Sequence, residues 1–254
     1  MRIQLVRHAT LRIDCSRRVI LIDPYLAPKH SCPPYAGKSP NPLVDLPFAP
    51  ERAVEGVDLT IISHLHSDHF DKTARDLLPK TMKVFCQPGS QTELASLGFV
   101  DVTPVDNILE WSGVTITRIP GRHGEGKVLW EMGPASGFVL QAPGEPVVYW
   151  AGDTIMCEAV REAISRFRPR IVITHSCGAV WGDHVPIVMD APQTVDVCRM
   201  LPEGVVVATH MDSVDHATVS RADLRSYATG QGIGPERLVI PADGETLDFG
   251  TPTA

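Results

Sequence analysis

The sequence predicts an α/β protein in which two stacked sheets carry helices on their outer faces. Short runs of β-branched residues, typical of strands, alternate with stretches of helical periodicity. The strands come in consecutive groups, above all between residues 110 and 152, before a helix intervenes. This order favours packed sheets over strict βαβ winding. Because the 254 residues contain no repeat and no Ser/Gly-rich linker, we expect one domain over residues 1–254.

Nine segments have the hydrophobic runs of strands, and five have the spacing of helices. The predicted strands are residues 3–6, 19–22, 59–62, 83–86, 114–119, 137–140, 147–150, 171–173 and 205–208. The predicted helices are residues 72–78, 91–97, 156–167, 192–200 and 221–229, the last one preceded by a loop that feeds its start. Residues 24–50 alternate Pro, Gly, Asn and Lys without a period, and a loop of that length in a compact domain is usually functional.

The composition is that of a soluble globular protein, with 43% hydrophobic and 21% charged residues. The net charge of −7 and the lack of a dense Lys/Arg run argue against nucleic acid as a partner. No apolar run has the ~18 to 20 residues of a membrane span, and residues 1–7 do not resemble a secretory signal. Six cysteines without a C-x-x-C pair predict free thiols in a reduced cytoplasm. We therefore expect a cytoplasmic protein with a small-molecule substrate, and a homo-oligomer is compatible with the sequence.

The segment that follows the predicted strand 59–62 has the pattern H-x-H-x-D-H. In an extended chain His64 and His66 project from the same side, because side chains alternate with a period of two. Two neutral imidazoles spaced in this way can hold a divalent cation between them. Asp68 and His69 follow in the turn and can address a second, adjacent position. The pattern therefore predicts a metal site.

Three further candidate ligands come from distant parts of the chain. His123, Asp153 and His210 each follow a predicted strand, as His64 does. Loops at strand ends are where α/β scaffolds commonly place their sites. A single His or Asp in such a place is usually a cap or turn residue, but the recurrence after four strands predicts that these loops converge on one metal centre.

These motifs together resemble the metallo-β-lactamase superfamily. The resemblance spans nearly the whole chain and rests on H-x-H-x-D-H, the later His123, Gly152-Asp153-Thr154 and the final His210. Shorter segments are similar to its L-ascorbate-6-phosphate lactonase-like branch of metal-dependent hydrolases, and these are Arg7-His8-Ala9-Thr10, Ile22-Asp23-Pro24 and Pro241-Ala242-Asp243-Gly244-Glu245. The resemblance implies an αββα sandwich of two mostly antiparallel or mixed sheets.

The resemblance also implies how the ligands divide between one or two metal ions. His64, His66 and His123 would bind one ion, Asp68, His69 and His210 would bind the other, and Asp153 would bridge the two. Zinc is the first expectation and manganese the next, while iron, nickel or cobalt also suit His and carboxylate ligands. Similar proteins tend to carry Asn near His175, so the role of this histidine stays open.

Such a centre lowers the pKa of a coordinated water toward about 7 and so supplies hydroxide at neutral pH. We expect Asp68 to orient this nucleophile or to move its proton, in addition to acting as a ligand. His184 and His216 are candidates for protonating the leaving group. His8 and Asp23 also follow strands. Each is as compatible with a structural role as with supporting a ligand.

The predicted function is hydrolysis of a small, anionic lactone, ester or phosphoester. Arg7, Arg122 and Lys127 are candidate anion contacts, although each also fits a solvated surface. An iron-dependent oxidoreductase or oxygenase on the same ligands, a phosphodiesterase or nuclease, and a metal-binding protein without catalysis are the alternatives. A nucleotide-binding P-loop at residues 121–127 is rejected, because Val128 replaces the required hydroxyl residue and the segment after it does not predict a helix.

Overall fold

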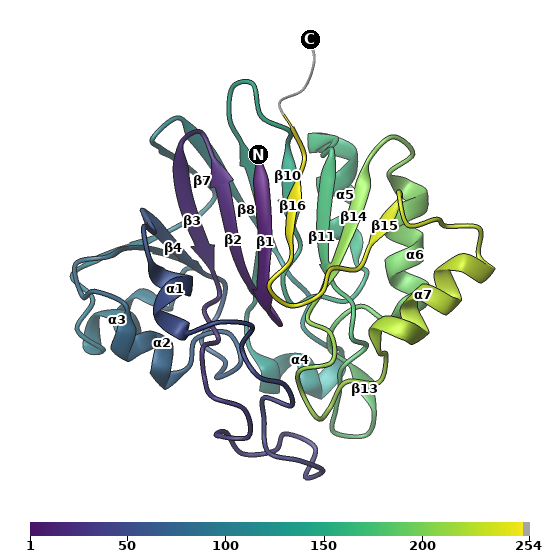
Figure 1. Cartoon of the computed structure of the whole chain (residues 1–254), viewed down its shortest axis with the longest axis horizontal. Helices are drawn as coiled ribbons and strands as arrows, with labels where there is room; N and C mark the ends of the chain where they lie inside the picture. Colours follow the sequence, from purple (N-terminus) through teal and green to yellow (C-terminus); the bar gives the residue numbers. More distant parts are fainter. Residues whose placement is uncertain (251–254) are drawn as a thin grey trace.

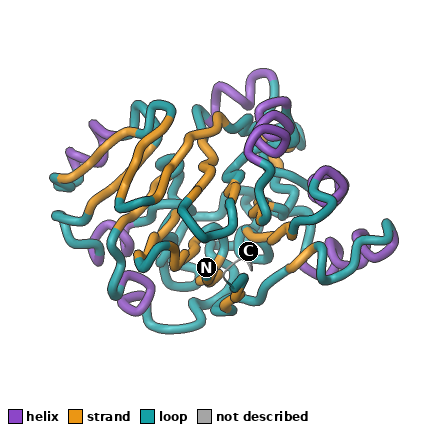
Figure 2. The backbone as a smooth tube through the Cα atoms, turned by 90° about the horizontal axis from the view of Figure 1, so that it is seen from above, coloured by secondary structure: helices purple, strands orange, loops and turns teal. Residues whose placement is uncertain are grey.

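The computed structural model describes residues 1–250. Two seven-stranded sheets pack face to face, and helices lie on the outer side of each (Figure 1). Seen from above, the strands run through the middle of the molecule and the helices lie at its periphery (Figure 2). The predicted sandwich is confirmed.

The first sheet is built from the N-terminal part of the chain and one C-terminal strand. Its strands are β1 (Arg2–Arg7), β2 (Thr10–Cys15), β3 (Arg18–Ile22), β4 (Leu59–Ile62), β5 (Lys83–Cys86), β6 (Asp101–Pro104) and β16 (Thr246–Asp248). They lie in the order β16-β1-β2-β3-β4-β5-β6. Pairing is antiparallel from β16 to β3 and parallel from β3 to β6, so the sheet is mixed.

The second sheet is also mixed, with one parallel and one antiparallel part. Its strands are β7 (Ile108–Trp111), β8 (Val114–Pro120), β9 (Ser136–Gln141), β10 (Val148–Trp150), β11 (Ile171–His175), β14 (Val205–Thr209) and β15 (Leu238–Val239). They lie in the order β15-β14-β11-β10-β9-β8-β7, parallel as far as β10 and antiparallel beyond it. A separate hairpin consists of β12 (Val180–Trp181) and β13 (Val185–Pro186).

Alternation along the strands divides the apolar side chains between two kinds of core. In β3, Ile20 and Ile22 face the space between the sheets, whereas Leu21 faces the outer helices. In β10, Trp150 lies between the sheets and Tyr149 lies under the helices. Because these strands are covered on both faces, their sequences are continuous apolar runs rather than alternating ones.

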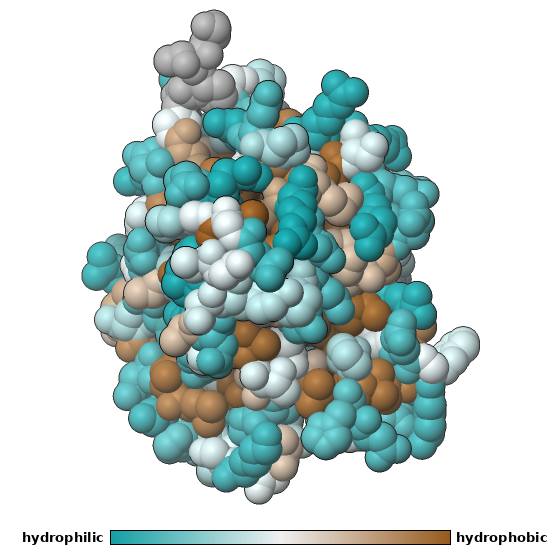
Figure 3. Space-filling model, turned by 90° about the vertical axis from the view of Figure 1, so that its right-hand side faces the viewer, coloured by the Kyte–Doolittle hydropathy of each residue, from teal (hydrophilic) through white to brown (hydrophobic). Residues whose placement is uncertain are grey.

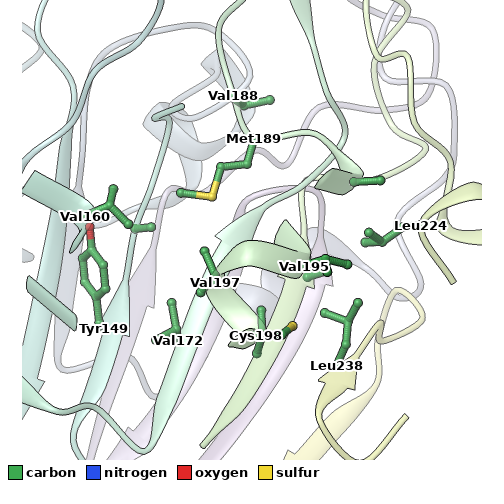
Figure 4. Packing of buried hydrophobic residues seen from close by; sticks show 14 of the residues in the cluster. Tyr149, Val160, Val172, Val188, Met189, Val195, Val197, Cys198, Leu224 and Leu238 are labelled. Atoms are coloured by element: carbon green, nitrogen blue, oxygen red, sulfur yellow. The ribbon is translucent and has the colours of Figure 1, made fainter. Parts of the chain in front are cut away.

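Short helices cover the two outer faces. They are α1 (Pro50–Val54), α2 (Lys72–Leu77), α3 (Gln91–Ser96), α4 (Gly126–Met132), α5 (Glu158–Phe167), α6 (Ala191–Met200) and α7 (Arg221–Gly230). The first three cover the first sheet, and α5 to α7 cover the second (Figure 1). Figure 4 shows Val195 and Val197 of α6 packed with Val172 of β11 and Leu224 of α7. Side chains fix the starts of three of these helices, since Asp71 caps α2, Asp190 caps α6 and Ser220 forms a capping box with Asp223 in α7.

All nine predicted strands and five predicted helices are present, with ends shifted by at most two residues. β2 is not among the predicted strands, although Leu11 and Ile13 alternate inward with Arg12 and Asp14 outward. The short edge strands and α1 are also not among the predicted elements. The expectation that no helix follows the glycine-rich residues 121–127 is wrong, because α4 begins at Gly126.

Several strands with parallel directions end at one edge of the sandwich. Residues 24–50, α4 and the β12–β13 hairpin lie below this edge in Figure 1. Figure 3 shows the side that carries α7 as mostly hydrophilic, with hydrophobic side chains gathered in its lower half. Within residues 1–250, no helix has the length and apolar character needed to cross a membrane.

Candidate metal centre

The structure brings the seven predicted ligands together at this edge. Oδ2 of Asp153, which follows β10, lies 3.2 Å from Nε2 of His69 and 3.4 Å from Nε2 of His123. The same oxygen lies 3.7 Å from Nε2 of His64, and Oδ1 lies 3.6 Å from Nε2 of His210. Residues that lie up to 146 positions apart in the chain, from His64 to His210, therefore surround one carboxylate.

The potential ligand atoms form four overlapping groups, and two of these correspond to the two predicted metal positions. The other two are His69, Asp153, His175 and His210, and Asp23, His64 and His69. Atoms of His64, His66 and His123 lie within 4.8 Å of one another and form the first group. Atoms of Asp68, His69 and His210, together with His8, form the second group within the same limit. This division agrees with the one that the resemblance implies for two ions.

Hydrogen-bond partners assign the tautomers of most of these histidines. Nδ1 of His69 donates to Oδ2 of Asp23 at 2.6 Å, and Nδ1 of His123 donates to the carbonyl of Ile187 at 2.7 Å. Nδ1 of His64 donates to the hydroxyl of Ser63 at 2.8 Å. With the proton on Nδ1, each Nε2 keeps its lone pair toward the centre.

His210 also turns Nε2 toward the centre, and the partner of its Nδ1 is a sulfur atom. Its Nδ1 lies 3.2 Å from Sγ of Cys177, and its Nε2 lies 3.4 Å from Nε2 of His69. Burial raises the pKa of the Cys177 thiol, so this cysteine is a neutral hydrogen-bond partner and not a nucleophile. His66 differs from the others, because its Nδ1 lies 3.0 Å from Nε2 of His64.

The electrostatics of the cluster fit a divalent cation. Burial lowers the pKa of His64, His123 and His210, so these imidazoles are neutral donors near pH 7. Burial alone would also lower the pKa of His69, but the carboxylates of Asp153 and Asp23 raise it well above its usual value. Lone pairs and carboxylates that face one another at 3 to 4 Å repel unless a cation lies between them. A bound cation requires neutral imidazoles and ionised carboxylates, so it would displace the proton that the two carboxylates favour on His69.

Two more histidines lie in the cluster, and the sequence analysis left the roles of both open. His8, after β1, has Nε2 3.4 Å from Oδ2 of Asp68. His175, the last residue of β11, has Nδ1 2.5 Å from Oδ1 of Asp153. Both are fully or almost fully buried. Their position at strand ends is the signal that could have placed them in the site.

A pocket of about 280 Å³ opens beside the cluster. It is lined by Tyr35, His66, Ser67, Asp68, His123, Glu131, Met132, Asp153, Trp181, Ile187, Val188, His210 and His216. One of the two predicted proton donors, His216, is among these residues and is 6% exposed. The other, His184, lies outside the pocket, exposed in the turn of the β12–β13 hairpin. The structure therefore does not support a catalytic role for His184.

None of the predicted cationic contacts lines this pocket. Arg7 is fully buried, and its guanidinium donates to the carbonyls of Tyr25, Ala27 and Val44. Arg7 therefore holds residues 24–50 against β1 instead of binding an anion. Arg122 and Lys127 form ion pairs with the neighbouring residues Glu125 and Glu131.

Asp215 holds the same loop from the other side of the pocket. Its carboxylate accepts hydrogen bonds from the backbone N–H of Tyr35 at 2.9 Å and from the side-chain amide of Asn41 at 3.0 Å. The hydroxyl of Tyr35 is 2.7 Å from that of Ser67, and its ring packs edge-on against His216 at 5.1 Å. Residues 24–50 thus contribute Tyr35 to the lining of the pocket.

Comparison with known proteins agrees with this geometry. Residues 18–211 match the model of the beta-lactamase superfamily domain. The UPF0173 protein YddR of Bacillus subtilis is 31% identical over 255 residues, which cover 98% of this chain and 100% of YddR. A UPF0173 metal-dependent hydrolase of Xanthobacter autotrophicus is 28% identical over 98% of both chains.

A similar solved structure is that of the isothiocyanate hydrolase from Delia radicum gut bacteria. It has 33% sequence identity and a TM-score of 0.92, and the match covers 99% of this chain and 100% of that one. The resemblance to the lactonase-like branch stays a prediction. The chain therefore belongs to the metallo-β-lactamase superfamily, as one of its metal-dependent hydrolases.

Proposed function

We propose that the protein hydrolyses a small, uncharged electrophile with an apolar substituent, and that an organic isothiocyanate is the first candidate. The observation that carries this proposal is the lining of the pocket beside the metal centre. Met132, Trp181, Ile187 and Val188 form its apolar part, and no Lys or Arg is among its lining residues. This lining favours an uncharged substrate over the anionic one expected from the sequence. The similarity to an isothiocyanate hydrolase over the whole chain supports the same substrate class.

The metal ions would be held by the two groups of ligands around Asp153. His64, His66 and His123 suit one ion, and Asp68, His69 and His210 suit the other. Ions bound there lower the pKa of a coordinated water toward about 7, which makes hydroxide available at neutral pH. Asp68 is 7% exposed at the pocket wall, so it can orient the attacking water and accept its proton.

His216 is the residue best placed to return a proton to the substrate. Burial lowers its pKa, although the carboxylates of Asp68, Asp153 and Asp215 oppose this shift, so the ring is neutral at pH 7 and can accept a proton. Its Nδ1 has no hydrogen-bond partner among the described residues. In an isothiocyanate the water oxygen bonds to the central carbon while a proton reaches the nitrogen, and the resulting thiocarbamate then breaks down to an amine and carbonyl sulfide.

A substrate panel tests the proposal. Metal-loaded and chelator-treated protein is assayed with benzyl isothiocyanate, phenyl acetate, γ-butyrolactone and bis(p-nitrophenyl) phosphate, and oxygen uptake is followed in parallel. We expect the isothiocyanate to have the highest kcat/KM, with activity lost on chelation and no oxygen consumed. Preferred turnover of the phosphodiester, or of the lactone, would replace the proposed substrate class, and oxygen uptake would favour the oxygenase alternative.

Two histidine variants test the proton route. His216→Gln keeps a polar side chain but cannot relay a proton, and we expect kcat to fall by about 10²-fold or more. His184→Gln is the matched control, because His184 is exposed outside the pocket. We expect its kcat to stay within about twofold of the wild-type value. Equal losses in both variants would rule out the assignment of His216.

A further inference from the structure

His175 occupies a position that the strand register determines. It is the last residue of β11 and pairs with Thr209 of β14, directly before the ligand His210. On the other side, β10 pairs with β11 and ends at Trp150, three residues before Asp153. The two neighbouring strands therefore place one metal ligand on each side of the His175 side chain.

The imidazole of His175 makes one polar contact. Its Nδ1 lies 2.5 Å from Oδ1 of Asp153, and since an ionised carboxylate can only accept, Nδ1 carries the proton. Its Nε2 is buried without a hydrogen-bond partner among the described residues. The ring packs edge-on against Trp150 at 5.5 Å and lies 4.7 Å from the ring of His210, so its orientation is restrained.

This contact gives the two oxygens of Asp153 different surroundings. Oδ1 faces the N–H of His175 at 2.5 Å and lies 3.6 Å from Nε2 of His210. Oδ2 faces Nε2 of His69 at 3.2 Å and Nε2 of His123 at 3.4 Å. His69 belongs to one group of ligands and His123 to the other. Oδ2 of Asp153 is therefore the oxygen that faces ligands of both groups.

We propose that His175 is a positioning residue for the metal centre, which holds Oδ1 of Asp153 and thereby directs Oδ2 at the ligands of both metal positions. His175 lies beyond the seven ligands and acts through Asp153. A hydrogen-bond partner of a ligand changes metal affinity by about 10- to 100-fold when it is removed. The proposal rests on the metal-dependent function proposed above but not on the substrate, because its test measures metal binding.

The chain offers a matched pair of substitutions at this position. His175→Asn keeps an N–H donor two bonds from Cβ, the place that Nδ1 has in histidine. His175→Leu has a similar size but has no donor. Metal-free protein is prepared with a chelator and titrated with Co²⁺, and both the affinity and the visible absorption band of bound Co²⁺ are recorded. The number of bound ions is measured by elemental analysis, and the melting temperature of the metal-free protein is measured for each variant.

We expect H175L to bind Co²⁺ about 10- to 100-fold more weakly with an altered absorption band, and H175N to stay within about threefold of the wild type. Wild-type affinity and spectrum in H175L would overturn the proposal, as would an H175N variant as weak as H175L. A lower melting temperature of H175L with unchanged Co²⁺ binding would assign His175 a merely structural role and would also overturn it.

If H175L does not fold, His175→Gln takes its place, because the Gln amide lies one bond further from Cβ and is displaced from Oδ1. Weaker Co²⁺ binding by H175Q than by H175N would then support the proposal, and equal binding would contradict it. Loss of isothiocyanate turnover by the wild type bears only on the proposed substrate, so the two failures are distinguishable.

Discussion

Oδ2 of Asp23 lies 2.6 Å from Nδ1 of His69, and both side chains are fully buried. The same oxygen accepts a hydrogen bond from the hydroxyl of Ser63 at 2.6 Å, and that hydroxyl accepts one from Nδ1 of His64 at 2.8 Å. The proposed division assigns His64 and His69 to different metal positions, and ligand atoms of both also lie within 4.8 Å of Asp23. One carboxylate therefore fixes the tautomer of a ligand at each metal position, directly in one case and through a hydroxyl in the other.

Asp23→Asn tests this shared support. Asn tolerates the left-handed backbone at this position (φ 43°), but its amide has one acceptor oxygen, whereas Oδ1 of Asp23 accepts from the backbone N–H of Ser63 and Oδ2 accepts from Ser63 and His69. We expect the affinity for both metal ions to fall by about 10- to 100-fold, measured by competition with a chromophoric Zn²⁺ chelator. Ser63→Ala removes only the path to His64 and should weaken one ion. Two ions bound to D23N with wild-type affinity would contradict the shared role.

Substitution of Asp68 is expected to affect catalysis more than metal binding. Its Oδ2 lies 3.4 Å from Nε2 of His8 and 3.9 Å from Nε2 of His210, at the wall of the pocket. We predict that Asp68→Ala lowers kcat by about 10²- to 10⁴-fold while losing less metal than His64→Ala or His123→Ala. Activity and metal content are measured on the same preparations. Equal and complete metal loss in all three variants would remove the special role of Asp68.

The backbone before Asp153 has no room for a side chain. Gly152 has φ +66°, and a Cβ there would lie 2.8 Å from the carbonyl oxygen of Ser136. Gly144→Ala is the control, because Gly144 also has positive φ (+75°) but has nothing within 4 Å of a Cβ. We expect G144A to cost about 1 kcal/mol from the backbone conformation alone. Gly152→Ala should cost about 1–3 kcal/mol more and weaken metal binding, since Asp153 must move.

Urea unfolding of the metal-free proteins measures this difference. Similar free energies of unfolding for the two variants would show that the loop around residue 152 relaxes to accept a methyl group. In that case the close approach to Ser136 would not be what positions Asp153.

The hydrogen bonds to the carboxylate of Asp215 make the free energy of unfolding depend on pH. Burial alone would raise the pKa of its carboxyl, but hydrogen bonds from Asn41 and from backbone N–H groups of residues 35–38 lower it to about 2. Because the unfolded carboxyl titrates at 3.8, the resulting stability is complete above that pH and is lost as the pH falls toward 2. The shift corresponds to about 2 kcal/mol. Asp215→Asn should lower the free energy of unfolding at pH 7 by about this amount and flatten its decrease in acid.

The control for this prediction is Asp183→Asn, a substitution of an exposed aspartate in the β12–β13 turn. We expect it to change neither the free energy of unfolding at pH 7 nor its slope in acid. Parallel acid profiles for D215N and the wild type would show that Asp215 does not anchor residues 24–50 through an ionised carboxylate.

Local sequence was sufficient to predict the framework of the fold and the side chains that cluster as candidate ligands. The run of residues 59–62 forms a strand that is buried at every position. A strand covered on both faces needs a nearly continuous apolar sequence, and this is the pattern that predicted it. His64 and His66 lie on one side of the extended chain because strand side chains alternate with a period of two, and Asp68 and His69 follow in the adjacent turn. His123, Asp153 and His210 each follow a strand, and this placement also indicated that they converge.

Only the tertiary structure decided which groups surround these ligands. His175 meets Asp153 because two parallel strands lie side by side in one register, and a pairing between distant strands leaves no local signal. Asp23 reaches His69, and Asp215 reaches Tyr35 across 180 residues, for the same reason. The helix α4 likewise forms in a glycine-rich segment with buried Val128, where packing outweighs a weak local propensity. The sequence alone thus predicted the candidate metal ligands, and the fold decided their hydrogen-bond partners and the apolar pocket beside them.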